Sequence, residues 1–345
     1  MLFSAAMSVG VLSRSTEAWA SSRQKTDVVY MQNGDRITGE IESLEKGSLS
    51  VKPYYVSSSI ALDWTKVDHL ESSQLFLVVD PNGTSYLGTF GRSAEKNMLH
   101  ILGPDGAALP HDSVIEISEI GSTFVKRMRG NIDAGLSATA SNQQNDLTVQ
   151  AGLTYQSEKQ IYSFSSSSQF ATQEKTEDTN ETTVKSAVFH QLKDSNWYVG
   201  AIANFLSSSE QQIDLQSTLG AALSKRIIFT NKTDLTAIGG LGYTRLRNPS
   251  GAESTASKNS LDSAFAVQYS TFRFDSTTFD TAVWVYPSIT SPGHVRVTLN
   301  QNVYYKFLGD FYIRFSFYNN YDNRPVVGAP ANNLGGSTSV GWSFH

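Results

Sequence analysis

The feature that most constrains this chain is a series of long stretches, from Arg129 to the C-terminus, in which apolar and polar residues alternate. One stretch places Leu147, Val149, Leu153 and Tyr155 on one side, with polar or small residues between them. A period of two predicts a β-strand. A tilted strand needs about 9–11 residues to cross a bilayer, whereas globular strands average about 5–6. The length of the alternation therefore favours membrane-crossing strands over a soluble β-sandwich, whose strands also alternate but are shorter.

The alternation predicts an all-β fold with a transmembrane antiparallel β-barrel of about twelve strands over 129–345, and an even number is typical of bacterial barrels. The predicted strands are 129–141, 145–157, 159–172, 182–193, 196–207, 211–229, 234–248, 260–274, 277–289, 294–308, 311–323 and 334–345. Polar connections at 173–181, 249–259 and 324–333 alternate with tight turns such as Asp194-Ser195 and Gly309-Asp310. Short periplasmic turns opposite longer outer loops produce this alternation, which predicts that both ends of the barrel chain face the periplasm.

Composition agrees with a barrel and excludes several other classes. The chain has no run of eighteen apolar residues, and only 39% of its residues are hydrophobic, but alternating strands average out to such values. The net charge of −5 leaves no basic surface for nucleic acid. The absence of cysteine excludes disulfides and thiolate sites.

The region before the barrel contains an internal repeat. Asn33-Gly34 recurs as Asn82-Gly83, and Asp63 recurs as Asp112, each at a spacing of 49 residues. Asn-Gly between alternating apolar runs predicts a hairpin, because both turn residues must adopt positive φ. The repeat predicts two tandem small β modules, at 26–72 and 73–122.

Residues 1–20 are predicted to be a signal peptide with an incomplete basic region. Leu2 to Leu12 is apolar, and Ala18-Trp19-Ala20 resembles a small-x-small cleavage site. Export would place the repeated modules in the periplasm and the barrel in the outer membrane.

Several of these residues resemble a known family. The stretch from Asp27 to Ile41, followed by Leu62-Asp63-Trp64 and Val67, and the barrel onset Gly130 to Leu136 are similar to domain-of-unknown-function family 481. Its members are often described as salt-induced outer membrane proteins with a periplasmic leader module. The resemblance implies an outer-membrane location. This chain departs from the pattern in that it ends in His345, which leaves Phe344 one place short of the terminal aromatic typical of barrel-assembly signals. The resemblance implies location rather than an activity.

A search for catalytic or metal-binding residues predicts none, and no cofactor. His111-Asp112-Ser113 contains three triad residue types, but neighbours in a chain cannot converge as a triad does, so a polar turn is expected there. His190 lies among apolar neighbours and is expected at the membrane interface, although an outer-membrane hydrolase would use such a histidine. Thr176 to Glu181 lacks the glycine of a calcium loop and is expected to be a solvated outer loop.

Charged residues on the polar side of the alternation are the candidate lumen-facing set. They are Asp133, Asp214, Asp262, Asp280, Arg296, Lys306 and Arg314. Such charges can line an ion path or pair to fill a closed barrel. Two main functions stay open: a small-solute channel or envelope-stress protein, and a closed anchor that presents the periplasmic modules to peptidoglycan or an envelope protein. An outer-membrane hydrolase is a more remote alternative. The expected partners are outer-membrane lipid and, during biogenesis, the barrel-assembly machinery.

Overall fold

The structure is a computed structural model that describes most of the chain beyond residue 26. The described ranges are 27–92, 95–104, 106–120, 128–139, 144–157, 159–173, 176–193, 195–247, 259–273, 277–308, 310–325 and 330–344. The predicted signal peptide and nearly all of the connection 249–259 lie outside these residues. None of the helices in the described ranges is long and apolar enough to cross a membrane.

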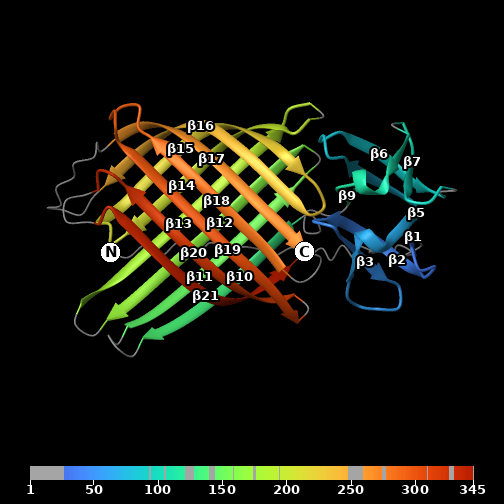
Figure 1. Ribbon diagram of the computed structural model, residues 1–345, viewed down its shortest axis with the longest axis horizontal. Coiled ribbons are helices and arrows are strands. Elements are labelled where there is room, and N and C mark those ends of the chain that lie inside the picture. Colours follow the sequence, from blue (N-terminus) through green and yellow to red (C-terminus); the bar gives the residue numbers. More distant parts are fainter. Residues whose placement is uncertain are drawn as a thin grey trace, which may run out of the picture.

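The C-terminal part forms a closed barrel of twelve antiparallel strands, in which each strand pairs with its neighbours in the chain (Figure 1). The strands are β10 (Met128–Thr139), β11 (Gln144–Gln156), β12 (Gln160–Gln173), β13 (Thr176–Gln191), β14 (Trp197–Ser208), β15 (Ile213–Phe229), β16 (Thr233–Arg247), β17 (Asn259–Arg273), β18 (Thr277–Pro287), β19 (Val295–Leu308), β20 (Phe311–Asp322) and β21 (Asn332–Phe344). The prediction of twelve barrel strands is confirmed. The predicted loop at 173–181 is wrong, because β13 already begins at Thr176.

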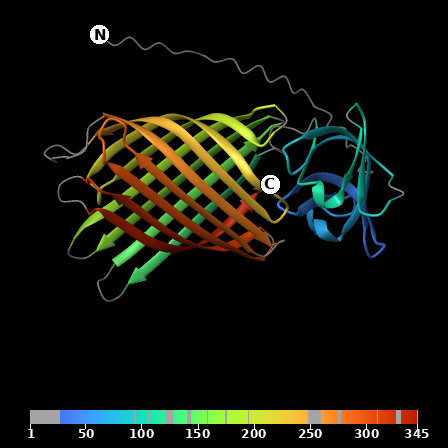
Figure 2. The same cartoon turned by 45° about the horizontal axis from the view of Figure 1, so that its top comes forward.

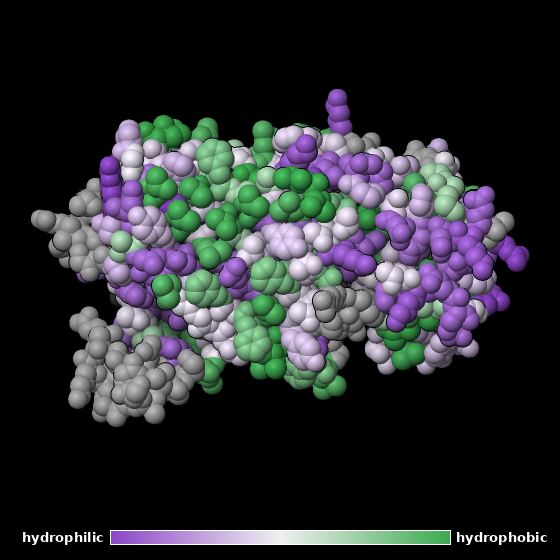
Figure 3. Space-filling model, viewed as in Figure 1, coloured by the Kyte–Doolittle hydropathy of each residue, from purple (hydrophilic) through white to green (hydrophobic). Residues whose placement is uncertain are grey.

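The outer wall of the barrel is apolar. Leu136, Leu219, Phe265 and Val340 are each more than half exposed on outward-facing positions. Figure 3 shows hydrophobic side chains spread over the barrel and hydrophilic ones gathered on the N-terminal domain. A closed barrel leaves no unpaired strand edge in hydrocarbon, and its apolar wall replaces contact with water by contact with lipid. The chain is therefore an outer-membrane β-barrel.

Residues 27–120 form a small all-β domain against one end of the barrel (Figures 1 and 2). Its strands are β1 (Asp27–Met31), β2 (Arg36–Glu45), β3 (Ser48–Pro53), β4 (Ile60–Asp63), β5 (Val67–Val79), β6 (Ser85–Gly91), β7 (Met98–Leu102), β8 (Ala107–Pro110) and β9 (Glu116–Glu119). We call the barrel end beside this domain the proximal end and the other the distal end. Strand β10 begins and β21 finishes at the proximal end.

The predicted sequence repeat corresponds to a structural repeat, but its two copies are not separate modules. Each copy has a hairpin with a glycine at positive φ in its turn, Gly34 at 93° and Gly83 at 81°. Strand β5 runs through the predicted boundary between residues 72 and 73 and pairs with β1, β6 and β9. One hydrophobic core contains buried residues from both copies, among them Ile41 and Phe90. The two copies therefore form one domain.

The copies meet where Trp64 stacks on His111. Trp64 begins one short helix, η1 (Trp64–Lys66), and His111 begins the other, η2 (His111–Ser113). Their ring centroids lie 4.0 Å apart, and the Trp64 indole Nε1–H donates to the His111 carbonyl at 3.1 Å. His111 is buried whereas Asp112 is fully exposed, so the three triad residue types form a structural turn.

The barrel closes through pairing of its first and last strands. Five residue pairs join β10 to β21, from Gly130 opposite Phe344 to Ala134 opposite Val340. On the inner face of this seam, Arg314 of β20 reaches past β21 to the Asp133 carboxylate of β10, at 3.2 Å. Asn131 also donates to Asp133, at 2.7 Å. Gly341 of β21 lies opposite Asp133, and a Cβ at this position would collide with the Asp133 carboxylate.

We expect acid to destabilise the N-terminal domain through His111. Burial lowers the pKa of His111 below its ordinary 6.5, against a smaller opposing effect of Asp112. Since the unfolded chain takes up the proton first, the stability present at neutral pH is lost as the pH falls below about 6.5. The measurement is the melting temperature of the N-terminal domain within the full chain in detergent. Between about pH 7.5 and pH 5 this temperature should fall further in the wild type than in His111→Phe, which keeps an aromatic ring on Trp64. Equal losses in the two proteins would contradict this origin.

We also expect the seam ion pair to support barrel stability. Arg314→Ala leaves the Asp133 side chain, which has 0% exposure, without its cation. Breaking a buried pair from one side costs about 3–5 kcal/mol, while an exposed pair contributes about 0–1 kcal/mol. The temperature at which the folded, fast-migrating gel band disappears should fall in Arg314→Ala. It should hardly move in the control Arg247→Ala, whose partner Asp214 lies 3.9 Å away at the exposed rim. Equal shifts would show that the seam pair has no special role.

Candidate functional site in the barrel lumen

The lumen is lined by the polar side of the alternation and is crossed by side-chain contacts. Tyr318 of β20 donates to Gln169 of β12 at 3.5 Å, although three other strands separate these two along the wall. Arg314 donates to Gln150 of β11 from the same side. These side-chain contacts cross the lumen and narrow the open path through it.

A second ion pair lies on the inner face nearer the distal end. Arg296 of β19 donates to the Asp262 carboxylate of β17 at 2.6 Å, across the intervening strand β18. Thr244 and Ser260 also donate to Asp262, each at 3.0 Å. The Arg296 guanidinium lies over the Tyr286 ring at 5.6 Å. The Asp262 charge is therefore neutralised and hydrogen-bonded within the wall.

An apolar layer covers part of the inner wall between these charged groups. Ala222, Ile238 and Ala266 are buried on neighbouring strands β15 to β17. Phe189 of β13 and Trp284 of β18 pack against them from either side. The two rings pack against two alanines and Ile238, so this part of the inner wall is apolar.

Most of the predicted lumen-facing residues lie on the inner face. Asp133, Asp262, Arg296 and Arg314 form the two ion pairs described above. Asp280 and Lys306 lie on the inner face by register, since Asp280 is opposite Asn302 and Lys306 is opposite Tyr312.

Asp214 is the exception. Its carboxylate pairs with Arg247 at the distal rim, with 43% of its side chain exposed. The pairing of β14 with β15 shifts register between Leu206 and Ser208, next to where β15 begins, which alternation alone does not reveal.

His190 lies on the outer face of β13, where its register partners are Gln160 and Val199. Within the described residues, no group of three or more histidine, aspartate and glutamate side chains is arranged to hold a metal ion.

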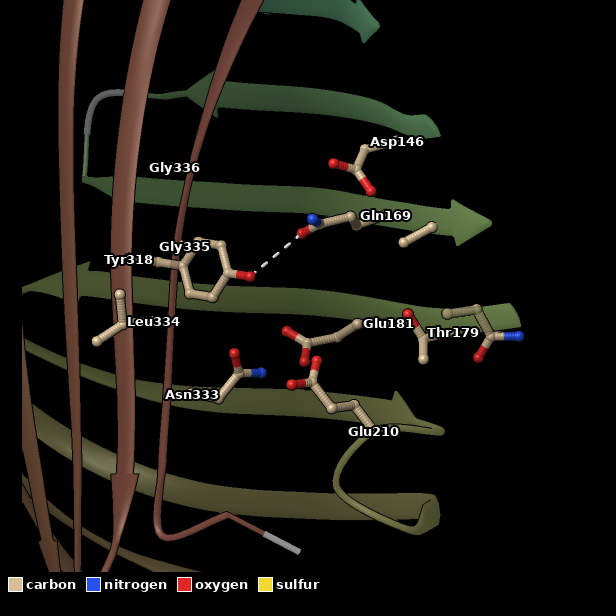
Figure 4. Close-up of a pocket in the computed structure, with 12 residues that line it drawn as sticks. Asp146, Gln169, Thr179, Glu181, Glu210, Tyr318, Asn333, Leu334, Gly335 and Gly336 are labelled. Carbon is tan, nitrogen blue, oxygen red and sulfur yellow. Dashed lines mark hydrogen bonds between the residues drawn. The ribbon is translucent and has the colours of Figure 1, made fainter. Parts of the chain in front are cut away.

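The sequence did not predict a cavity of about 270 Å³ at the distal end of the lumen (Figure 4). Its lining includes the carboxylates of Asp146, Glu181 and Glu210, from β11, β13 and the turn after β14. Tyr318 and Asn333 line the other side. Glu181 was expected on a solvated loop, and the alternation of β13, continued back to Thr176, would have placed it on the inner face.

The proximal mouth is contacted by three turns of the N-terminal domain. Asn196 and Gln191 of the barrel donate to the carbonyls of Pro81 and Gly83, at 2.7 and 2.9 Å. Asn231 donates to the carbonyl of Val114 at 2.8 Å. The ammonium group of Lys46 lies 5.1 Å from the centre of the Phe272 ring.

Glu116 makes the contact that reaches the inner wall. One carboxylate oxygen lies 3.6 Å from the guanidinium of Arg226 on β15, and the other accepts from Gln156 of β11 at 2.9 Å. Both barrel residues are on the inner face, and the side chains of Arg226 and Glu116 are 16% and 12% exposed. One carboxylate thus links two separated parts of the proximal mouth. Nothing in the alternation of residues 116–119 predicted this contact.

Comparisons with known proteins concern the barrel. A search of curated proteins found no match. Among solved structures, the translocator domain of autotransporter NalP from Neisseria meningitidis has 15% identity and a TM-score of 0.37, covering 62% of this chain and 86% of that one. The KdgM porin has 12% identity and a TM-score of 0.35, covering 62% and 99%. The COG4313 outer membrane channel from Pseudomonas putida F1 has 10% identity and a TM-score of 0.36, covering 63% and 94%.

The family comparison covers the barrel from its first strand to its last. The model of DUF481, a family of proteins of unknown function, matches residues 132–344, more than half of the chain. This confirms the resemblance seen in the sequence, and the chain belongs to the DUF481 family.

Proposed function

We propose that this protein is a small-solute channel of the outer membrane whose proximal mouth is closed by its N-terminal domain. The observation that carries the proposal is the position of Glu116, which bridges Arg226 and Gln156 on the inner wall of the mouth. Burying a carboxylate against the lumen wall costs desolvation free energy. This cost would not arise if the domain were only tethered to the barrel and made no contact with the mouth.

The contacts between the N-terminal domain and the barrel are of a kind that allows the domain to move away from the mouth. They are hydrogen bonds from side chains to turn carbonyls, one cation over a ring and ion pairs such as that between Glu45 and Arg129. Interfaces of this polar kind permit relative motion of domains more readily than large hydrophobic ones. The cross-lumen contacts of Arg314 and Tyr318 limit the open path to small solutes.

The proposal includes an orientation in which the proximal end and the N-terminal domain face the periplasm. The longest connections, 248–258 and 323–331, join distal strand ends, whereas the turns that join proximal strand ends, such as 230–232, are short. Bacterial barrels place short turns in the periplasm. In this orientation the wall contacts outer-membrane lipid, and the barrel-assembly machinery inserts the chain from the periplasmic side.

A second candidate function is a closed anchor. It is favoured by the cross-lumen contacts and by an exposed aromatic pair, Tyr54 and Tyr55, at 70% and 65% exposure after strand β3. Such residues would suit a contact with peptidoglycan or an envelope protein.

Conductance of the protein in planar bilayers should separate these functions. The double variant Gly83→Ala/Glu116→Lys should raise the time-averaged conductance about tenfold or more, because reversing one charge of a poorly exposed pair costs about 2 kcal/mol or more. A Cβ at Gly83 would lie 2.6 to 2.9 Å from atoms of Ser195 and Asn196, so the turn could no longer dock.

The matched control is Gly34→Ala/Asp35→Lys. Gly34 occupies the same turn position at positive φ, yet nothing lies within 4 Å of its added Cβ. This control should behave as the wild type. If the double variant folds, as its heat-dependent gel migration would show, and still passes no current, the channel is excluded and the anchor is favoured.

The orientation can be tested by cysteine labelling, because the natural chain has no cysteine. Ala331→Cys at the distal end should react with a membrane-impermeant maleimide on intact cells. Ser57→Cys in the N-terminal domain should react only after the outer membrane is permeabilised. The opposite pattern would reverse the proposed orientation.

A further inference from the structure

The distal cavity has the features of a binding site for a charged ligand. Its carboxylates come from three separate elements, and Figure 4 shows Glu181, Glu210 and Asn333 pointing toward one another. Oε2 of Glu181 accepts from Ser208 Oγ at 3.2 Å. In the described part of the chain neither Glu181 nor Glu210 has an ion-pair partner within 4 Å.

Asn333 gives an independent indication of a ligand. The residue is only 7% exposed, and it lines the cavity from β21. Its side-chain amide makes no hydrogen bond with any described residue. An amide that is largely buried and has no partner within the protein is available to a donor or acceptor inside the cavity. The amide is aimed at the same space as the two glutamates.

The arrangement of these groups selects the kind of cation. Glu181 and Glu210 lie close together, whereas Asp146 lies apart from them, and within the described residues no group of three or more such side chains is arranged to hold a metal ion. Lys185, four residues after Glu181 on the same inner face, lowers the local negative charge without removing it. A ligand with several separated ammonium groups can meet separated carboxylates, and each N–H also donates to amide or phenol oxygens. A compact divalent ion needs more converging oxygen ligands than two glutamates supply.

We propose that the distal cavity binds linear polyamines, with Glu181 and Glu210 pairing with ammonium groups and Asn333 accepting a hydrogen bond from one of them. The proposal deepens the proposed function, since the cavity lies on the path that a solute would follow. Binding itself does not require an open proximal mouth.

The test is calorimetric titration of the detergent-solubilised full chain with spermidine. Glu181→Gln/Glu210→Gln should weaken binding about tenfold or more, because each amide retains shape but loses the charge. The control Asp214→Asn removes a carboxylate at the same end of the barrel that does not line the cavity, and it should bind as the wild type does.

Three results would overturn the assignment: no spermidine binding by folded wild-type protein, equal weakening by the control, or tighter binding of Mg²⁺ than of spermidine. Because titration does not depend on conductance, a failure here leaves the channel proposal standing. Conversely, specific spermidine binding by a protein that never conducts would support the cavity while excluding the channel.

Discussion

The structure depends on one requirement, which is that every backbone hydrogen-bonding group inside the bilayer must have a partner within the protein. A sheet meets it only when its first and last strands pair, and here β10 and β21 do so beside the Asp133–Arg314 ion pair. Once the sheet is closed, the alternation of each strand assigns one face to lipid and the other to the lumen. The apolar wall, the buried ion pairs and the distal cavity all follow from that division.

The lumen has different properties along its length. Carboxylates surround a cavity at the distal end. Elsewhere along the lumen, charges are paired within the wall, and an apolar layer lies beneath Phe189 and Trp284. At the proximal mouth an acidic side chain of another domain meets Arg226. This order suits a path that attracts small cations at one end and is closed at the other, which is the physical basis of the proposed channel.

Local patterns in the sequence were sufficient for the barrel because strand period and strand length are local properties. All twelve strands were predicted from alternation, but the beginning of β13 was not, because residues 176–181 are all polar and show no alternation of apolar and polar side chains. Asp214 was misplaced because a register shift depends on the neighbouring strand. The pairs Asp133–Arg314 and Asp262–Arg296 could not be predicted, as they join strands that alternation does not align. The repeat in residues 27–120 was visible in the sequence, but the sharing of β5 was not.

The surface on which the N-terminal domain rests is made of pieces from distant parts of the chain. These pieces are Arg129 near the start of β10, Gln156 at the end of β11, Asn196 just before β14, Asn231 just after β15 and Phe272 near the end of β17. These residues lie at their mutual distances only after more than half of the barrel has paired in register. The N-terminal domain is synthesised first, yet the barrel surface on which it docks is complete only late in assembly. Docking of the domain therefore requires a correctly assembled barrel wall.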